Sequence, residues 1–175
     1  MKLFIGMLSG DLSLLDLCTG ILQKTYGPVD METQAAEWAF TDYYTDEMGS
    51  GLLRKFIFFE RLCHPGGLAG IKNFTNRLEQ QTAISVNEGV KRKINLDPGY
   101  VTEAKVVLAT TKDFSHRIYI GDDIYAEVTL RYRAGTFEPL EHTYPDYRSE
   151  EYIRLFNHAR DVLRKAVRQV DGDRS

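Results

Sequence analysis

The chain has 175 residues, of which 43% are hydrophobic and 27% are charged, an ordinary composition for a folded domain. A chain of this length can bury a core large enough to fold without disulfides or metals. Its 22 basic and 25 acidic side chains give a net charge of -3, which argues against nucleic-acid binding through bulk positive charge. We expect a single α+β domain over residues 1–170 and a disordered tail over residues 171–175.

Membrane and metal-binding signals are absent from the sequence. No apolar run reaches the roughly 18 residues that a membrane-spanning helix needs, and the first residues lack the pattern of a secretion signal. We therefore expect a cytoplasmic protein whose two cysteines, Cys18 and Cys63, are reduced thiols of the core. The four histidines do not have a zinc-binding spacing, so no metal site is predicted.

The first half of the chain reads as strand, helix, strand, strand, helix, strand. The elements expected are a strand at 3–8, a helix that begins after Asp11 and ends at Gly27-Pro28, strands at 36–44 and 53–62 that form a hairpin, a helix from Leu68 to Leu78, and a strand at 91–96. This order is typical of a ferredoxin-like βαββαβ fold with a mainly antiparallel sheet.

The second half predicts a helix, a hairpin and a last helix. Asp97 can cap a helix with Pro98 in its first turn, and Val101, Ala104, Lys105 and Leu108 fit one helical face to about residue 109. The run at 106–108 suits a strand equally well. Strands at 116–120 and 124–132 form a hairpin around residues 121–123, and Ser149 caps the last helix. The apolar face of that helix consists of Tyr152, Phe156, Ala159, Leu163, Ala166 and Val170.

Polar side chains that can bind an anion are concentrated between residues 95 and 148. Hydroxyl, ammonium and guanidinium groups close together can make several charge-assisted bonds to a phosphate or carboxylate, and tyrosines suit binding pockets because a flat apolar ring ends in a polar group. The candidate ligand-binding residues are Lys105, Thr110, Thr111, Lys112, Arg117, Tyr144, Tyr147 and Arg148. The alternative is a set of polar loops with surface ion pairs.

Histidines and carboxylates in the same region are candidates for acid–base catalysis. If Asp122 and Asp123 are the two turn residues of the hairpin, Ile118 faces Glu127 and His116 faces Thr129, which places His116 and Glu127 on one face. The candidate catalytic residues are His116, Glu127, His142 and Asp146. A structural pair explains them equally well. The carboxylates of Asp97, Glu127 and Asp146 could hold Mg²⁺ with a substrate phosphate, but their spacing does not require it, and the cofactor remains unknown.

Several of these segments resemble one bacterial and archaeal family. They are Asp97-Pro98-Gly99-Tyr100, Thr110-Thr111-Lys112-Asp113, His116-Arg117-Ile118-Tyr119, residues 124–130 and residues 143–149, with Tyr43-Tyr44, Glu47-Met48-Gly49 and residues 72–76 in the first half. Nearly the whole chain is similar to the domain of unknown function family 4416. The resemblance implies no established activity, although some members are labelled GTP-binding proteins.

The residues argue against a conventional GTPase. A P-loop needs Gly-x-x-x-x-Gly-Lys-Ser/Thr, whose amides cradle the phosphates, and the sequence does not contain it. Residues 66–72 are glycine-rich, but their spacing is wrong. Thr111-Lys112-Asp113 places a carboxylate one residue too early for the guanine-reading pattern, and Phe114 occupies the required position. These residues do not argue against a nucleotide that is bound without a P-loop.

Four functional hypotheses follow from the sequence. The favoured one is binding of an anionic small molecule such as a nucleotide, which requires Lys105, Lys112, Arg117 and Arg148 to converge on one concave surface. The second is an acid–base enzyme with a His–carboxylate pair in a cleft. The third is RNA binding through exposed aromatics such as Tyr43, Phe56 or Phe58, against which the negative net charge and the missing RNP1-type pattern argue. The fourth is a protein-interaction domain without a small-molecule site. The sequence does not indicate an oligomeric state.

Overall fold

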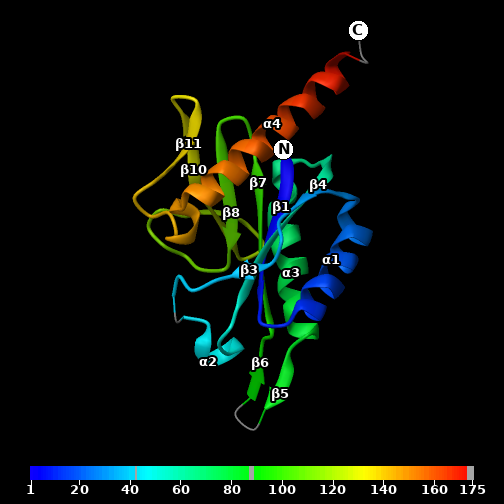
Figure 1. Ribbon diagram of the computed structural model, residues 1–175, viewed down its shortest axis with the longest axis vertical. Helices are drawn as coiled ribbons and strands as arrows, with labels where there is room; N and C mark the ends of the chain where they lie inside the picture. Colours follow the sequence, from blue (N-terminus) through cyan, green and yellow to red (C-terminus); the bar gives the residue numbers. More distant parts are fainter. Residues whose placement is uncertain (42, 87–88, 173–175) are drawn as a thin grey trace.

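The computed structural model describes residues 1–41, 43–86 and 89–172, and in this part of the chain nine strands form one antiparallel sheet (Figure 1). These strands are β1 (Lys2–Ser9), β2 (Val29–Glu32), β3 (Ala36–Glu37), β4 (Leu53–Leu62), β7 (Ile94–Val101), β8 (Lys105–Thr110), β9 (Ile118–Gly121), β10 (Ile124–Arg133) and β11 (Thr136–Pro139). A separate hairpin consists of β5 (Ile84–Val86) and β6 (Gly89–Lys91). The α-helices are α1 (Leu12–Tyr26), α2 (Thr45–Met48), α3 (Leu68–Gln81) and α4 (Glu150–Gly172), and two 3₁₀ turns are η1 (Pro65–Gly67) and η2 (Asp146–Arg148).

The strands lie in the order β11-β10-β8-β7-β1-β4-β2, with β3 beside β4 and β9 beside β10. Strand β1 is central because it pairs with both β4 and β7, and every neighbouring pair is antiparallel. The expected α+β class with a mainly antiparallel sheet is confirmed. The ferredoxin-like assignment stays an interpretation, because three short strands, β2, β5 and β6, interrupt the expected order.

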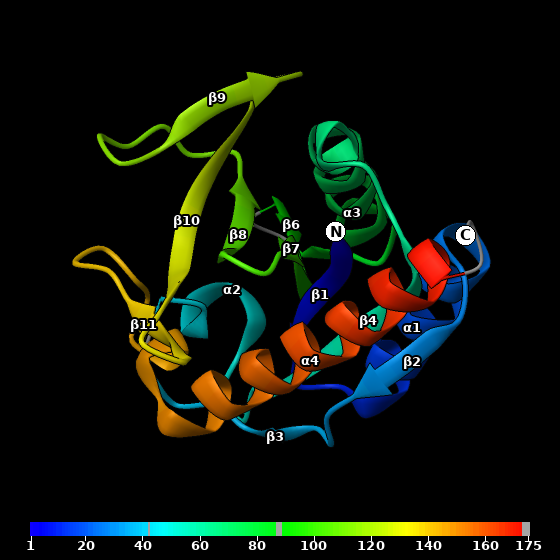
Figure 2. The same ribbon diagram turned by 90° about the horizontal axis from the view of Figure 1, so that it is seen from above.

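Helices cover the centre of the sheet on both faces (Figure 2). Side chains of β1 alternate between the two faces, as a strand requires. Leu3 and Ile5 pack with apolar residues of α1 and α3 on one face, while Phe4 contacts Phe156 of α4 on the other, with ring centroids 4.9 Å apart. The sheet therefore separates two cores, which leaves strand ends and loops as the places where a ligand can enter.

Local signals for the helices are confirmed. The Asp11 side chain accepts hydrogen bonds from the amides of Ser13 and Leu14 at the start of α1, and Gly27 ends that helix with a φ of 103°. The Ser149 hydroxyl accepts a bond from the Tyr152 amide at the start of α4. The predicted apolar face of α4 is buried at Tyr152, Phe156, Ala159 and Leu163. The Val170 side chain and residues 173–175 of the expected tail lie outside the described part.

The helix expected from Asp97 to residue 109 is wrong, because this segment forms strands β7 and β8. Residues 106–109 are all buried, so the strand presents a continuous apolar run that also fits a helix. Gly99 shows why an extended chain is accommodated here. A Cβ atom at this position would collide with the carbonyl oxygen of Val107 and lie 2.6 Å from Cζ of Phe4. Only a glycine lets β7 approach β8 and Phe4 so closely.

The strand expected at 36–44 is also wrong over most of its length. Strand β3 comprises only Ala36 and Glu37, and the chain then continues as a loop into α2, with Asp42 outside the described residues. The expected hairpin partner is correct, because Ala36 pairs with Arg54 of β4. Four short strands were not expected, β2, β5, β6 and β11. The alternation of aromatics at 38–44 resembles a strand. These aromatic side chains instead belong to a loop and line a cleft.

The hairpin of β9 and β10 confirms the turn but not the register. Asp122 and Asp123 adopt positive φ angles of 52° and 59°, as a two-residue turn between strands requires. An irregularity after Ile124 then shifts the pairing, so that Ile118 faces Ala126 instead of Glu127. The prediction that His116 faces Thr129 is also wrong, because β9 begins only at Ile118 and His116 lies in the loop before it.

Two further outcomes concern partners. The aromatics proposed to stack RNA bases include Phe56 and Phe58, which are 1% and 0% exposed beneath α4, so the sheet face does not offer them to a base. In the described residues, no helix combines the length and the apolar character needed to cross a membrane.

Candidate functional site

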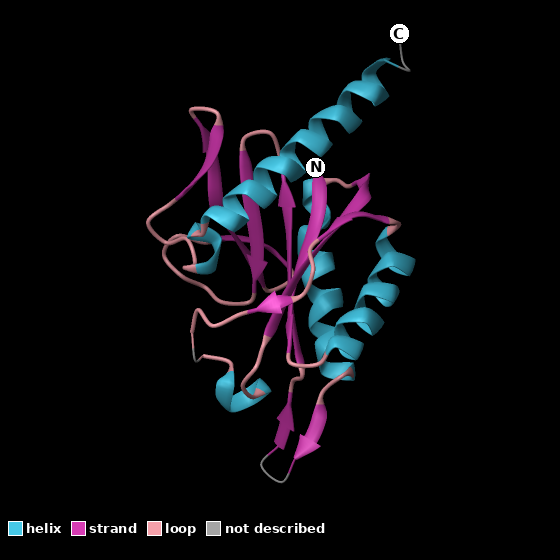
Figure 3. Cartoon of the chain, viewed as in Figure 1, coloured by secondary structure: helices cyan, strands magenta, loops and turns pink. Residues whose placement is uncertain are grey.

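A cleft of about 580 Å³ lies where the carboxyl-terminal end of β8 meets three loops, which are drawn in pink in Figure 3. The loops cover residues 38–44, of which Asp42 lies outside the described part, 111–117 and 142–145. The charged side chains that line the cleft are Arg54, Lys72, Arg92, Asp97, Lys112, Arg117, Glu127 and Asp146, and the aromatic ones are Trp38, Phe40, Tyr43, Tyr44, Phe114, Tyr144 and Tyr147. A concave site with apolar walls and a few convergent polar groups is the usual form of a small-molecule site.

Most of the residues singled out from the sequence line this cleft. They are His116, Glu127, His142, Asp146, Thr110, Thr111, Lys112, Arg117, Tyr144 and Tyr147. Lys105 and Arg148 are not among its lining residues, so the expected convergence of four cations on one concave surface is wrong for these two. Lys105 lies at the opposite end of β8, because the segment is a strand and not a helix. Arg148 donates hydrogen bonds to the carbonyl oxygens of Leu140, Glu141 and Thr143, so it holds its own loop in place.

An outer polar network is built around the buried carboxylate of Glu127, whose side chain is 1% exposed. Arg117 donates from Nε to Glu127 Oε2 at 2.8 Å and from Nη2 to the Tyr144 hydroxyl at 2.6 Å. It also donates from Nη1 to the Lys112 carbonyl oxygen at 3.0 Å. His116 Nε2 lies 3.2 Å from the same Glu127 oxygen. Arg117 thus joins β10 to the 111–117 loop and to the 142–145 loop.

Two imidazole rings stack inside this network. The rings of His116 and His142 are 4.1 Å apart between centroids and nearly parallel, at 22°. Nε2 of His142 lies 3.2 Å from the Val128 carbonyl oxygen, and since a carbonyl can only accept, that bond requires a proton on Nε2. His116 is the more directly placed for proton transfer, because it contacts Glu127 and its side chain is 26% exposed.

An inner polar network was missed by sequence reasoning. Arg54 donates from Nη2 to Asp146 Oδ2 at 3.3 Å, and Trp38 donates from Nε1 to the same oxygen at 3.2 Å. Asp97 lies 3.7 Å from Arg54 Nη1 and 3.5 Å from Lys72 Nζ. The pairing of Asp146 with a histidine, which the enzyme hypothesis allowed, is therefore replaced by its bonds to Arg54 and Trp38.

Arg54 has unusual surroundings for a buried cation. Its side chain is 6% exposed, yet Nε and Nη1 lack a hydrogen-bond partner among the described residues. The ring of Trp38 lies 5.3 Å from the guanidinium carbon, which adds a cation–π contact. A signal for this residue exists in the sequence. Arg54 lies two residues before Phe56, so strand alternation places it on the buried face of β4 that carries Phe56, and Lys72 likewise lies on the buried face of α3.

The α2 side of the cleft is fixed by Arg92. Its Nε and Nη2 donate to the two carboxylate oxygens of Glu47 at 2.6 and 2.7 Å, and its Nη1 donates to Glu79 at 2.8 Å. The bonds from Arg92 lower the pKa of Glu47. Burial raises the pKa of Glu79, although Lys72 and the amide of Leu96 act in the opposite direction. Arg92 therefore joins α2 to the end of α3. Its positive charge is balanced by Glu47 and Glu79, which do not line the cleft.

The mouth of the cleft carries exposed rings and one cation. Lys112 Nζ donates to the Tyr43 hydroxyl at 2.8 Å and lies 4.4 Å from the centroid of that ring. Among the described residues, no carboxylate lies within 4.0 Å of this ammonium. Tyr43 belongs to the 38–44 loop and Lys112 to the 111–117 loop, so their contact bridges two walls of the cleft.

Tyr144 and Tyr147 keep their phenol protons near neutral pH. Burial raises the pKa of Tyr144 to about 12, and the charge of Glu127 acts in the same direction. Burial also raises the pKa of Tyr147 well above its usual value, and the Tyr147 hydroxyl lacks a partner among the described residues. Protonated phenols can donate to an anionic or carbonyl oxygen of a ligand.

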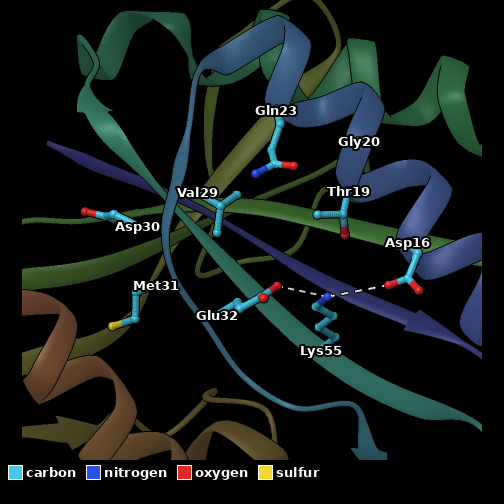
Figure 4. Close-up of a pocket in the computed structure, with 9 residues that line it drawn as sticks. All are labelled: Asp16, Thr19, Gly20, Gln23, Val29, Asp30, Met31, Glu32 and Lys55. Atoms are coloured by element: carbon cyan, nitrogen blue, oxygen red, sulfur yellow. Dashed lines mark ion pairs between the residues drawn. The ribbon is translucent and has the colours of Figure 1, made fainter.

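A second cavity of about 440 Å³ lies between α1 and β2 (Figure 4). Its charged lining residues are Lys55 and three carboxylates, Asp16, Asp30 and Glu32. Lys55 is paired with Glu32 at 2.9 Å and with Asp16 at 3.8 Å. Because its cation is already paired and acidic groups predominate, this groove suits an anion much less well than the cleft does.

The carboxylates that could hold Mg²⁺ do not gather around one point. Asp97 and Asp146 face Arg54, whereas Glu127 faces Arg117. In the described ranges, no group of three or more histidine, cysteine, aspartate or glutamate side chains is arranged to hold a metal ion.

Comparison with known proteins places the chain in a family. A search of curated proteins found no match, and a search of solved structures found none either. A family model matches residues 1–162, which is most of the chain. The protein belongs to the family described as Domain of unknown function (DUF4416).

Proposed function

We propose that the cleft binds a phosphorylated or otherwise anionic small molecule, a class that includes nucleotides. The observation that carries this proposal is the uncompensated charge of Lys112. Its ammonium lies in the cleft beside the Tyr43 hydroxyl, with no described carboxylate within 4.0 Å to balance its charge. The other lining cations are compensated by carboxylates: Lys72 by Asp97, Arg117 by Glu127, Arg92 by Glu47 and Glu79, and Arg54 by Asp146.

The groups around Lys112 strengthen the proposal. Thr110 and Thr111 supply hydroxyls beside it, and the Tyr144 phenol is held by Arg117 at the mouth. An anion beside Lys112 would gain charge-assisted bonds, which are roughly twice as strong as neutral ones. The glycine-rich residues 66–70 are not among the residues that line the cleft, so a nucleotide would bind by a different mode from a P-loop.

A thermal-shift screen against inorganic phosphate, pyrophosphate, sugar phosphates and nucleotides, with and without Mg²⁺, tests the proposal. A ligand at about 100 times its Kd stabilises the native state by roughly 2.7 kcal/mol, which moves the melting temperature by several degrees. Lys112→Ala should abolish the shift. Lys105→Ala is the matched control, because Lys105 lies outside the cleft. If no anion shifts the wild-type protein, or if both variants respond equally, the proposal is wrong.

A second function is favoured by one contact. His116 and Glu127 lie 3.2 Å apart in the cleft, in the arrangement of a histidine oriented by a carboxylate. An acid–base enzyme would therefore use His116 as the group that accepts or donates a proton. Any anion found to bind should be followed for conversion by nuclear magnetic resonance. Turnover that is lost in His116→Asn while binding persists would support this function, and unchanged ligand would argue against it.

Two less specific proposals remain. A failed anion screen would favour a protein-interaction domain, and the next experiment would be a search for a protein partner.

A cytoplasmic location is supported by Cys18 and Cys63, which are free thiols, because oxidising compartments favour disulfides.

A further inference from the structure

We infer that the ligand of the cleft carries a planar ring close to its anionic group, and that this ring binds against Tyr43 and Phe114. This inference rests on the proposed function, because it assigns the remainder of a molecule whose anionic group contacts Lys112. It identifies the ligand class as a ring-bearing phosphate and excludes a simple sugar phosphate or inorganic anion.

The exposed aromatic side chains are gathered at this cleft. Among the described residues, the phenylalanines and tyrosines that are exposed are Phe40, Tyr43, Phe114, Tyr119 and Tyr144, and all except Tyr119 line it. Tyr43 is 61% exposed and Phe114 is 53% exposed. Most large rings of the chain lie instead in the core. Exposed apolar patches in a concave site usually mark a binding surface, since covering them recovers the cost of their hydration.

The fold brings these rings together from distant parts of the sequence. Phe40 and Tyr43 lie in the loop after β3, Phe114 lies in the loop after β8, and Tyr144 lies in the loop after β11. Three loops that contribute exposed rings to one cavity make an apolar mouth above a polar floor. Such a division matches a ligand with a flat apolar part and a charged part.

Contacts with cations hold the two outermost rings in place. Lys112 Nζ is 4.4 Å from the centroid of Tyr43, and the guanidinium carbon of Arg117 is 4.5 Å from that of Phe114. Phe114 also lies nearly parallel to His116, with centroids 6.1 Å apart. Rings that are already oriented lose little freedom when a ligand stacks on them, so the stacking energy is retained as affinity.

The same contacts determine where the ring and the anion of the ligand lie relative to each other. Because Lys112 contacts Tyr43, an anion bound to Lys112 lies next to the Tyr43 ring. Arg117 contacts Phe114 and also donates to the backbone carbonyl oxygen of Lys112, which holds the second ring in the loop that carries Lys112. The ring and the anionic group of the ligand must therefore be close neighbours in one molecule.

Isothermal titration calorimetry with matched probes tests the inference. Adenosine 5′-monophosphate, uridine 5′-monophosphate and phenyl phosphate each carry a ring and a phosphate, whereas ribose 5-phosphate has no aromatic ring. At least one ring-bearing probe should bind about tenfold or more tightly than ribose 5-phosphate, because stacking on an aromatic side chain contributes on that scale.

Variants separate the ring from the hydroxyl and from general damage. Tyr43→Leu and Phe114→Leu should each weaken the ring-bearing probe about tenfold more than they weaken ribose 5-phosphate. Tyr43→Phe keeps the ring and should retain most of the affinity. Tyr119→Leu removes an exposed ring outside the cleft and should have no effect. Circular dichroism confirms that each variant folds.

The outcomes distinguish the inference from the function on which it rests. If ribose 5-phosphate binds as tightly as every ring-bearing probe, or if the leucine variants bind like wild type, the ring assignment is overturned while the anion site stands. If no phosphate binds at all, the proposed function fails and the ring assignment falls with it.

Discussion

Trp38 and Asp146 are 108 residues apart in sequence, yet the indole N–H of Trp38 donates to Asp146 Oδ2 at 3.2 Å. Arg54 donates to the same oxygen from β4. One carboxylate oxygen therefore joins the loop after β3, a central strand and the turn before α4. The three segments meet only when the chain is fully folded. The bonds to Asp146 therefore shape the floor of the cleft and also stabilise the folded protein.

Replacing Asp146 by alanine should destabilise the protein by about 3–5 kcal/mol, because it leaves the buried Arg54 guanidinium without its closest carboxylate. Urea unfolding followed by circular dichroism measures this change. Glu150→Ala is the control, since Glu150 pairs with Arg154 at the surface and its loss should cost less than about 1 kcal/mol. Equal losses in the two variants would contradict the role given to Asp146.

Arg117 and Glu127 form a second buried pair, and we expect strong coupling between them. Arg117→Met should cost about 3–5 kcal/mol, because Glu127 would keep a buried charge without its guanidinium. Adding Glu127→Met should recover most of that loss, since two apolar side chains can replace a buried ion pair. A double-mutant cycle of unfolding free energies measures the coupling. Additive losses would show that the pair is not coupled.

Gly99→Ala should destabilise the protein by about 1–3 kcal/mol, because the added methyl group collides with the Val107 backbone and lies 2.6 Å from Cζ of Phe4. Gly20→Ala is a matched control in the middle of α1, where an added Cβ meets nothing within 4 Å. That variant should gain up to about 1 kcal/mol, because alanine favours a helix more than glycine does. Thermal unfolding of both variants decides the matter, and a neutral Gly99→Ala would refute the close approach.

Alkaline pH should unfold the protein at the point where its buried tyrosines ionise. Burial raises the pKa values of Tyr26 and Tyr152 from 10.0 to about 12. The folded state therefore holds more protons than the unfolded state in this range, and stability present below pH 10 is lost as the pH rises through about 12. Tyrosinate absorbance measures the titration. A native midpoint equal to that in denaturant would contradict the expectation.

The sequence was most informative where a local rule determines the structure. Asp11, Gly27 and Ser149 mark helix ends through their own hydrogen bonds or φ angles, and the Asp122-Asp123 turn follows from a two-residue connection. It failed at 97–109, because a strand buried on both faces shows no alternation and matches a helical spacing by chance. It failed again in the hairpin, where one irregularity after Ile124 altered the register.

The same limit applies to the cleft. The residues at 110–147 share a short stretch of chain, so their chemistry could be noticed together before the fold was known. Arg54, Lys72 and Asp97 come from β4, α3 and β7, and only the pairing of β1 with both β4 and β7 brings them into one place. Contacts that depend on strand order in this way leave little trace in a single sequence.

The chain contains a single tryptophan, Trp38, and its indole lines the cleft, 5.3 Å from the Arg54 guanidinium. The intrinsic fluorescence of the protein therefore arises mainly from one buried ring in the lining of the cleft. Binding in the cleft can be followed through the wavelength and intensity of tryptophan emission, without a dye or a label. The method suits any compound that does not itself absorb at those wavelengths.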